Sequence, residues 1–176
     1  TPSATGPTTI NVLEDVYTDS VGNSNIAASE FNWFYDNVKP TMSITSTTVT
    51  SGSTTNDSSI NLIFTSSKPT NDFSLNDITV TNGSITSFSG SGTIYTATFT
   101  PSATGPTTIN VLEDVYTDSI GNSNQALLSE FNWTYDNVKP TISITSSTVN
   151  DGDTSNDSSI SLTFTSSATT TNFVEG

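Results

Sequence analysis

The chain has no cysteine and no histidine among its 176 residues. Disulfide scaffolds, thiolate metal sites and catalysis by Ser-His or Cys-His pairs are therefore excluded. Its only basic residues are three lysines, against 17 acids, and the net charge is -14. This balance disfavours nucleic acid and anionic membranes as partners and makes cations the natural counter-charge.

Long hydrophobic runs are also missing. No apolar stretch approaches the roughly 20 residues that a membrane helix needs, so we expect no membrane insertion. A signal segment is not present either, and for a secreted protein the targeting information would lie outside this sequence.

What the sequence does contain is a long internal repeat, which has to be settled before the fold. The string TPSATGPTTINVLEDVYTDS fills residues 1–20 and returns unchanged at residues 100–119. Further on, FNWFYDNVKPT matches FNWTYDNVKPT, and TNDSSINLIFTSS matches SNDSSISLTFTSS, now at an offset of 100 instead of 99. The extra residue falls between Asn124 and Glu130, which predicts a loop or a strand edge there.

A period near 100 residues is the size of one small domain. We therefore expect the C-terminal part of one repeat in residues 1–36, a complete repeat in residues 37–136 and the N-terminal part of the next in residues 137–176. The chain then starts and stops within a domain. Neither partial repeat can bury a core alone, so we expect these pieces to be completed by neighbouring copies or to reflect truncation.

Short bursts of alternating apolar and polar residues, separated by Gly-, Asn- and Ser-rich turns, predict an all-β fold. Seven strands are expected in the complete repeat, at residues 41–48, 58–66, 77–81, 84–88, 93–99, 107–112 and 130–136. Asn82-Gly83 is a typical hairpin turn and predicts that Ile78 and Val80 pair opposite Ile85 and Phe88. The expected core residues are Ile44, Leu62, Phe64, Val80, Tyr95, Phe99, Ile109, Val111, Phe131 and Trp133.

About seven short strands around one tryptophan are typical of an immunoglobulin-like sandwich. The segments DITVTNGSITSFSGSGTIYTATFTPSATG, TDSIGNSN and FNWTYDNVKPT resemble the bacterial Ig-like domains that repeat in large surface adhesins. The fold class is thus predicted as all-β, with tandem immunoglobulin-like β-sandwich repeats of about 100 residues. The resemblance implies a non-enzymatic extracellular module at the cell surface.

Acids and amides gather in the loops expected at the two poles of the sandwich. The loop before the last strand should lie at the entry pole, which places Asp114, Asp118 and Asn122 near Asp36. The loop between the first two strands should lie at the exit pole, which places Asp57 near Asp136.

Three lysines are too few to neutralise these loops internally, and calcium prefers carboxylate, amide and carbonyl oxygens. Together with the family resemblance, this predicts Ca2+ at the junctions, bound by Asp36, Asp114, Asp118 and Asn122 at the first and by Asp136 and Asp57 at the second. The alternative is that these residues only form turns by bonding their own backbone.

The favoured function is a structural spacer of an extracellular bacterial adhesin, stiffened by calcium at its domain junctions. Its partners would be neighbouring repeats of the same chain. One alternative is a subunit of an extracellular filament or of a viral or phage fibre, in which other copies are the partners. Another is a glycan- or protein-binding Ig-like module, although its loops are nearly copied between repeats.

Overall fold

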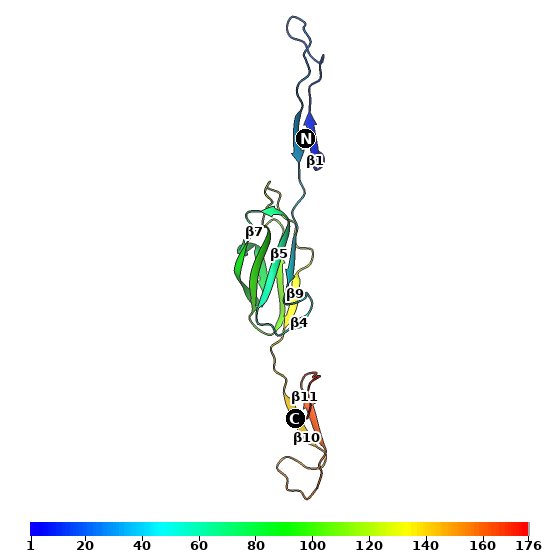
Figure 1. Cartoon of the computed structure of the whole chain (residues 1–176), viewed down its shortest axis with the longest axis vertical. Coiled ribbons are helices and arrows are strands. Elements are labelled where there is room, and N and C mark those ends of the chain that lie inside the picture. Colours follow the sequence, from blue (N-terminus) through cyan, green and yellow to red (C-terminus); the bar gives the residue numbers. More distant parts are fainter. Residues whose placement is uncertain (176) are drawn as a thin grey trace. The chain divides into compact units, whose positions relative to one another are not determined.

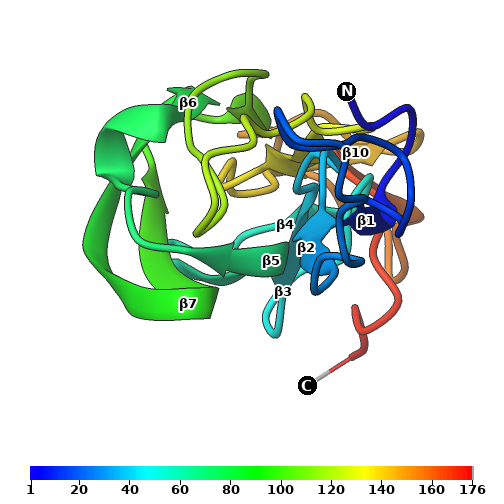
Figure 2. The ribbon, with the colours of Figure 1, turned by 90° about the horizontal axis from the view of Figure 1, so that it is seen from above.

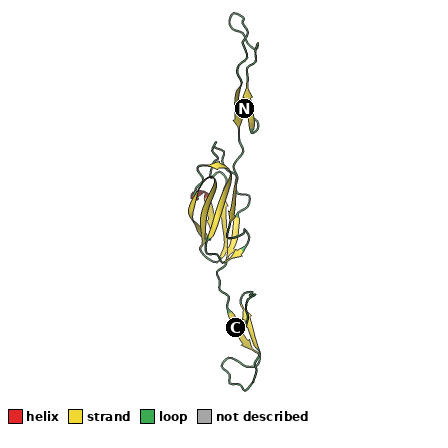
Figure 3. Cartoon of the chain, in the orientation of Figure 1, coloured by secondary structure: helices red, strands yellow, loops and turns green. Residues whose placement is uncertain are grey.

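The computed structural model describes residues 1–175 and is built almost wholly of β-strands (Figure 3). Contacts divide the chain into one unit, Thr1–Tyr135, and a second that begins at Asp136. No helix in residues 1–175 is long and apolar enough to cross a membrane. The elements are β1 (Gly6–Ile10), β2 (Phe31–Tyr35), β3 (Met42–Ser46), β4 (Thr54–Thr55), β5 (Ile60–Thr70), the 3-10 helix η1 (Leu75–Asp77), β6 (Ile78–Thr81), β7 (Gly83–Pro101), β8 (Gly105–Val111), β9 (Phe131–Tyr135), β10 (Ile142–Ser146) and β11 (Leu162–Ser166).

The centre of the first unit is a two-layer sandwich (Figure 1). One sheet has the strand order β3-β5-β7 and the other the order β4-β9-β8-β6. Seen from above, β5 and β7 lie on one side and β6 on the opposite side (Figure 2). All neighbours are antiparallel except β4 and β9, which run parallel. The all-β immunoglobulin-like sandwich expected from the sequence is confirmed.

Strand β5 shows how the alternating pattern builds this core. Ile60, Leu62 and Phe64 are all at most 1% exposed, while the residues between them point away from the core. Phe64 pairs with Tyr95 on β7, and Ile60 pairs with Phe99. Because fully burying such a side chain contributes about 1.5–3 kcal/mol, the period-two pattern fixes which face of β5 turns inward.

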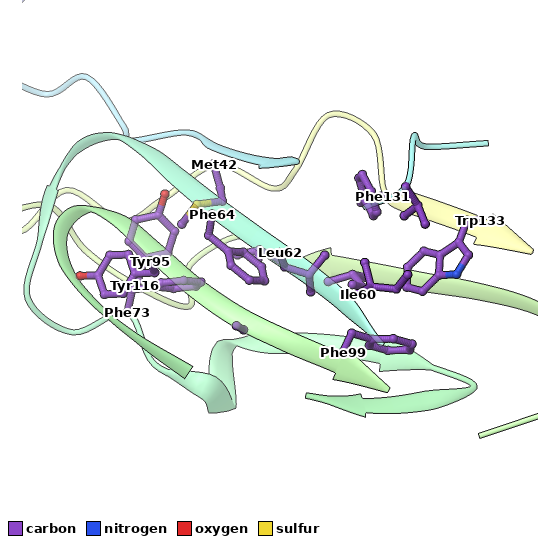
Figure 4. Close-up of a cluster of buried hydrophobic side chains, with 14 residues drawn as sticks. Met42, Ile60, Leu62, Phe64, Phe73, Tyr95, Phe99, Tyr116, Phe131 and Trp133 are labelled. Atoms are coloured by element: carbon purple, nitrogen blue, oxygen red, sulfur yellow. The ribbon is translucent and has the colours of Figure 1, made fainter. Parts of the chain in front are cut away.

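Aromatic rings fill both ends of the core (Figure 4). At one end Phe73 lies at the centre, with ring centroids 5.1 Å from Tyr95 and 5.3 Å from Tyr116. At the other end Phe99 meets Trp133 edge-on at 4.9 Å. The expected core residues are all in or against this cluster, with Ile44 and Val80 only partly buried. Phe73 and Tyr116 were not foreseen.

The prediction of a hairpin at Asn82-Gly83 is wrong. Ile78 and Val80 of β6 pair with Val111 and Ile109 of β8, so the chain crosses here from one sheet to the other. Asn82 does have a positive φ of 53°, but Gly83 does not, and the turn type that closes a two-residue hairpin on Asn-Gly needs both.

Strand β7 instead folds back on itself. The Thr86 hydroxyl contacts the carbonyl of Thr98, and the hydroxyls of Ser89 and Thr96 lie 3.4 Å apart. Glycine is required at the start of this strand, because a Cβ on Gly83 would lie 2.2 Å from the Phe99 ring. The short parallel strand β4 was also missed, since two threonines in a turn carry no signal for pairing with β9.

The hairpin β1-β2 repeats the pairing of β8-β9, with Gly6 opposite Tyr35 as Gly105 is opposite Tyr135. Its apolar face, however, is open: Phe31 is 67% exposed, whereas Phe131 is 6% exposed. Neither this hairpin nor its loop buries a core of its own.

The second unit holds the hairpin β10-β11, which repeats the register of β3-β5. Phe164 is opposite Ile144, as Phe64 is opposite Ile44. Phe164 is 47% exposed, whereas Phe64 is fully buried.

The one-residue insertion is Leu128. The N–H of Ala28 donates to Val12 O in the first repeat, and Leu127 donates to Val111 O in the second, so these two positions are equivalent. The next residue is the extra one, and its side chain is 97% exposed in the loop between β8 and β9. This location in a loop confirms the expectation.

Candidate functional site

The segment that enters the sandwich, residues 36–40, is called the linker here. Asp36 turns it by accepting the N–H of Val38 at 2.9 Å, a local bond that aspartate favours in turns. Pro40 fixes its end, because the ring is fully buried and its carbonyl accepts the N–H of Gln125 at 2.9 Å. The linker is thus bound to the surface of the domain that follows it.

Lys68, near the end of β5, is the main contact with the linker. Its ammonium donates to Asp36 Oδ2 at 2.8 Å, to Asp118 Oδ2 at 3.1 Å and to the carbonyl of Val38. An ammonium has three N–H donors, and all three are therefore used. The side chain is 21% exposed, so these bonds are partly shielded from water.

Asp118 is the most buried acid of this group, with a side chain 2% exposed. It accepts the N–H groups of Ile120 and Asn122 and the side-chain amide of Asn122, besides Lys68. Burial raises the pKa of Asp118, but the hydrogen bonds from Asn122, Lys68 and Ile120 outweigh it and lower the pKa to about 2. The carboxylate is therefore charged at any ordinary pH.

Asn122 connects this loop to the linker, since its Nδ2 also lies 3.3 Å from Asp36 O. The hydrogen bond from Lys68 is the largest influence on Asp36 and lowers its pKa. The same bond raises the pKa of Lys68. We call Asp36, Lys68, Asp118 and Asn122 the linker cluster.

A buried amide shapes the loop that carries Asp118. The side chain of Asn124 accepts the N–H groups of Val115 and Tyr116 and donates to the carbonyls of Leu112 and Gln125. Asn25 makes the same four bonds in the first repeat. The interpretation of such loop amides as oxygen donors for a metal therefore does not describe Asn124, whose amide is fully used in folding the loop.

Of the predicted calcium ligands, the structure brings Asp36, Asp118 and Asn122 together. Asp114 lies apart from them and forms an exposed ion pair with Lys39 at 3.1 Å. Asp57 accepts the hydroxyl of Thr55, and Asp136, in the second unit, accepts the N–H of Val138.

The linker cluster as it stands does not fit calcium. The ammonium of Lys68 stands between the two carboxylates, and Asn122 turns its N–H donor, not its oxygen, toward Asp118. In residues 1–175 no three acidic side chains are grouped closely enough to hold a metal. Calcium at the predicted residues stays an untested prediction. The assumption that the lysines leave the junction acids unpaired is wrong for Asp36, Asp118 and Asp114, because each of these carboxylates contacts a lysine.

Lys68 is the functional residue that the sequence interpretation missed, although a signal was available. The serine two residues before it bonds the carbonyl of residue 68, and Ser166 does the same to the carbonyl of Ala168. Lys68 and Ala168 therefore occupy equivalent positions in two otherwise similar repeats. A charged residue that changes to alanine between near-copies is a candidate for a repeat-specific role.

Comparison with known proteins agrees with this fold. The family model described as bacterial Ig-like domain matches residues 36–135, which is more than half of the chain and spans the whole sandwich with its linker. Searches of curated proteins and of solved structures gave no match. Domains of this kind are generally non-catalytic and commonly occur in extracellular or surface proteins. The chain therefore belongs to the bacterial Ig-like domain family.

Proposed function

We propose that this chain is a non-enzymatic spacer of an extracellular bacterial adhesin, in which successive Ig-like repeats hold a distant binding domain away from the cell. The observation that carries the proposal is the repetition itself. Strands β1-β2 and β8-β9 have the same register and almost the same residues, including the loop bonds of Asn25 and Asn124. Repeats that are nearly copied suit the building of length, because a ligand site is not needed in each one.

The anchored linker supports the same role. Lys68, Asn122 and Gln125 of the sandwich all bond the linker, so the chain reaches the domain through a short segment with little freedom. A domain that merely followed a flexible tether would leave residues 36–40 solvated. A spacer gains reach when each domain fixes the segment that precedes it.

A protein of three, five and seven consecutive repeats tests this role by small-angle scattering. For a spacer, the maximum dimension should grow in proportion to the number of repeats. Growth as the cube root of the mass, the behaviour of one compact body, would contradict it. A glycan array and a panel of surface proteins, probed with the same protein, test the binding-module alternative, for which a specific ligand would be decisive.

Calcium belongs to this proposal at the second junction. Ala168 stands there at the position of Lys68, and in residues 1–175 Asp136 accepts the N–H of Val138 and contacts no ammonium. The argument for calcium at Asp136 and Asp57 still applies here, because an unneutralised carboxylate favours binding of a hard cation. Titration of the several-repeat protein with calcium, followed by melting temperature and scattering, tests it. Equal values in calcium and in chelator would leave these acids as turn formers.

A filament subunit remains a second candidate, because two sheet faces are open. Phe31 on β2 and Phe164 on β11 are both about half exposed or more, although their equivalents in the sandwich are buried. Exposed apolar faces on strands recruit further chain. Light scattering of the 176-residue chain distinguishes the two: growth of the mass with concentration supports a filament, and a constant monomer mass supports the spacer.

A further inference from the structure

The position of Lys68 suggests a specific task, because its partners come from two distant parts of the chain. Asp36 lies 32 residues before it and Asp118 lies 50 residues after it. The ammonium is thus the point where β5, the linker and the loop between β8 and β9 meet. Without it, Asp36 and Asp118 would face each other as two unneutralised carboxylates.

The first repeat shows that the loop itself does not need this lysine. Asp19 accepts the N–H groups of Val21 and Asn23 and the side-chain amide of Asn23, as Asp118 does from Ile120 and Asn122. No ammonium contacts Asp19 in the described residues, and the loop has the same bonds. The contribution of Lys68 therefore lies in holding the linker, not in shaping the loop.

We propose that Lys68 is a tethered cation that locks the linker onto its own domain, in the place where the sequence suggested a metal. It acts as a positioning residue for residues 36–40, and the junction that it closes does not depend on calcium. Repeats with alanine at this position, as at Ala168, have an unlocked linker. In the absence of a bound cation, this single residue of the repeat thus decides whether a junction is stiff or hinged, which deepens the proposed spacer role.

Backbone 15N relaxation of the 176-residue chain tests the lock, with the amides of Asn37 and Val38 as reporters. In the unaltered protein their order parameters should equal those of β5, about 0.85. Lys68→Met keeps most of the apolar stem and removes the charge, and should lower them below about 0.6. Lys68→Arg should restore them in large part, because a guanidinium can reach both carboxylates.

Two controls separate the lock from general loosening. The amides of Ile120 and Asn122 should stay ordered in Lys68→Met, since their loop forms without a lysine in the first repeat. Lys39→Ala removes a more exposed ion pair and should leave Asn37 and Val38 ordered. A linker that is equally rigid in Lys68→Met, or equally mobile in the unaltered protein, overturns the proposal.

A gain-of-function variant tests the rule for the other repeat. In Ala168→Lys the new ammonium can reach Asp136 and the Val138 carbonyl, the equivalents of Asp36 and Val38 among the three partners of Lys68. The order parameter of the Val138 amide should then rise. No rise would overturn the rule that residue 168 determines whether the linker is mobile.

A calcium titration tests whether the first junction depends on metal. Millimolar calcium should leave the linker amides unchanged in the unaltered protein; a calcium-dependent shift of Asp36 and Asp118 resonances would show that metal displaces the lysine and would overturn the proposal. None of these outcomes depends on the length of the several-repeat protein, so the lock and the spacer role fail separately.

Discussion

Replacing Asn124 with alanine removes four hydrogen bonds from a side chain that is fully buried. The N–H groups of Val115 and Tyr116 and the carbonyls of Leu112 and Gln125 lose their partner. Each such bond contributes about 0.5–1.5 kcal/mol, and a buried group left unpaired costs about 1–3 kcal/mol. Relaxation of the loop toward water reduces the sum, and we expect a loss of roughly 2–4 kcal/mol.

For a domain of about 100 residues, this loss should lower the melting temperature by roughly 10–30 °C. The assay is thermal and urea unfolding followed by the fluorescence of Trp133, in a Trp33→Phe background so that only the sandwich is observed. Asn25→Ala is the matched control, because Asn25 makes the same four bonds at a half-buried position in the first repeat, outside the sandwich. That control should leave the transition of the sandwich unchanged.

Asn124→Asp refines the same prediction. The new carboxylate can still accept from Val115 and Tyr116 but would face the carbonyls of Leu112 and Gln125 at the positions of two former donors. Burial and this repulsion should raise its pKa above the unfolded value, so the variant should gain stability as the pH falls through that range. A loss below about 1 kcal/mol in Asn124→Ala, equal to that in Asn25→Ala, would refute the reasoning.

Three further perturbations address other features. Gly83→Ala places a Cβ 2.2 Å from the ring of Phe99 and should destabilise the sandwich by about 1–3 kcal/mol; Ser84→Ala, exposed on the same strand, is the control, and equal urea midpoints would contradict the close approach. Deleting Leu128 restores the loop length of the first repeat and should change stability by less than about 0.5 kcal/mol, so a clear drop in the melting temperature would show a hidden contact. The charge of Asp118 should add stability above its ordinary pKa of 3.8 that is lost as the pH falls toward about 2; urea unfolding between pH 6 and pH 2 checks this, and an equally steep acid loss in Asp118→Asn would count against it.

Local pattern was enough to predict the strands and most of the core. The alternation of apolar and polar residues in β5 and β9 decides which face of each strand is buried, and the neighbouring strands then complete the core on that face. The connection after β6 could not be predicted this way, because the dipeptide Asn82-Gly83 is compatible both with a hairpin turn and with a connection that passes from one sheet to the other. The choice depends on the long-range pairing of β6 with β8 and on the space beside Phe99.

The position of the candidate site could be predicted from the sequence, but the full set of residues that interact there could not. Topology alone puts Asp118 and Asn122 near Asp36, and the structure brings these three residues together. Lys68 was missed because a lysine near a strand end usually extends into solvent. Its partners are 32 and 50 residues away, so only the tertiary fold shows that its stem turns toward the linker.

The near-identity of β1-β2 and β8-β9 also creates a folding hazard. During synthesis the hairpin β1-β2 emerges first. It carries the same apolar residues that β8-β9 later packs against the sheet β3-β5-β7. In the sandwich, Trp133 meets the ring of Phe99 edge-on, and Phe99 pairs with Ile60, whereas Met42, where β3 begins, pairs with Ser66. A misplaced β2 would therefore end at one pole, while β3 starts near the other.

The linker is too short to allow that exchange. From Ile60 to Ser66 a strand rises about 20 Å, and the two layers of a sandwich lie about 10 Å apart. Tyr35 would lie two residues beyond the position of Trp133, which adds about 7 Å. The seven residue steps from Tyr35 to Met42 span at most about 25 Å even when fully extended, less than the roughly 29 Å required. The short connection between repeats thus prevents misfolding: it keeps the upstream copy of the hairpin, β1-β2, out of the sandwich, so that only β8 and β9 can occupy that position.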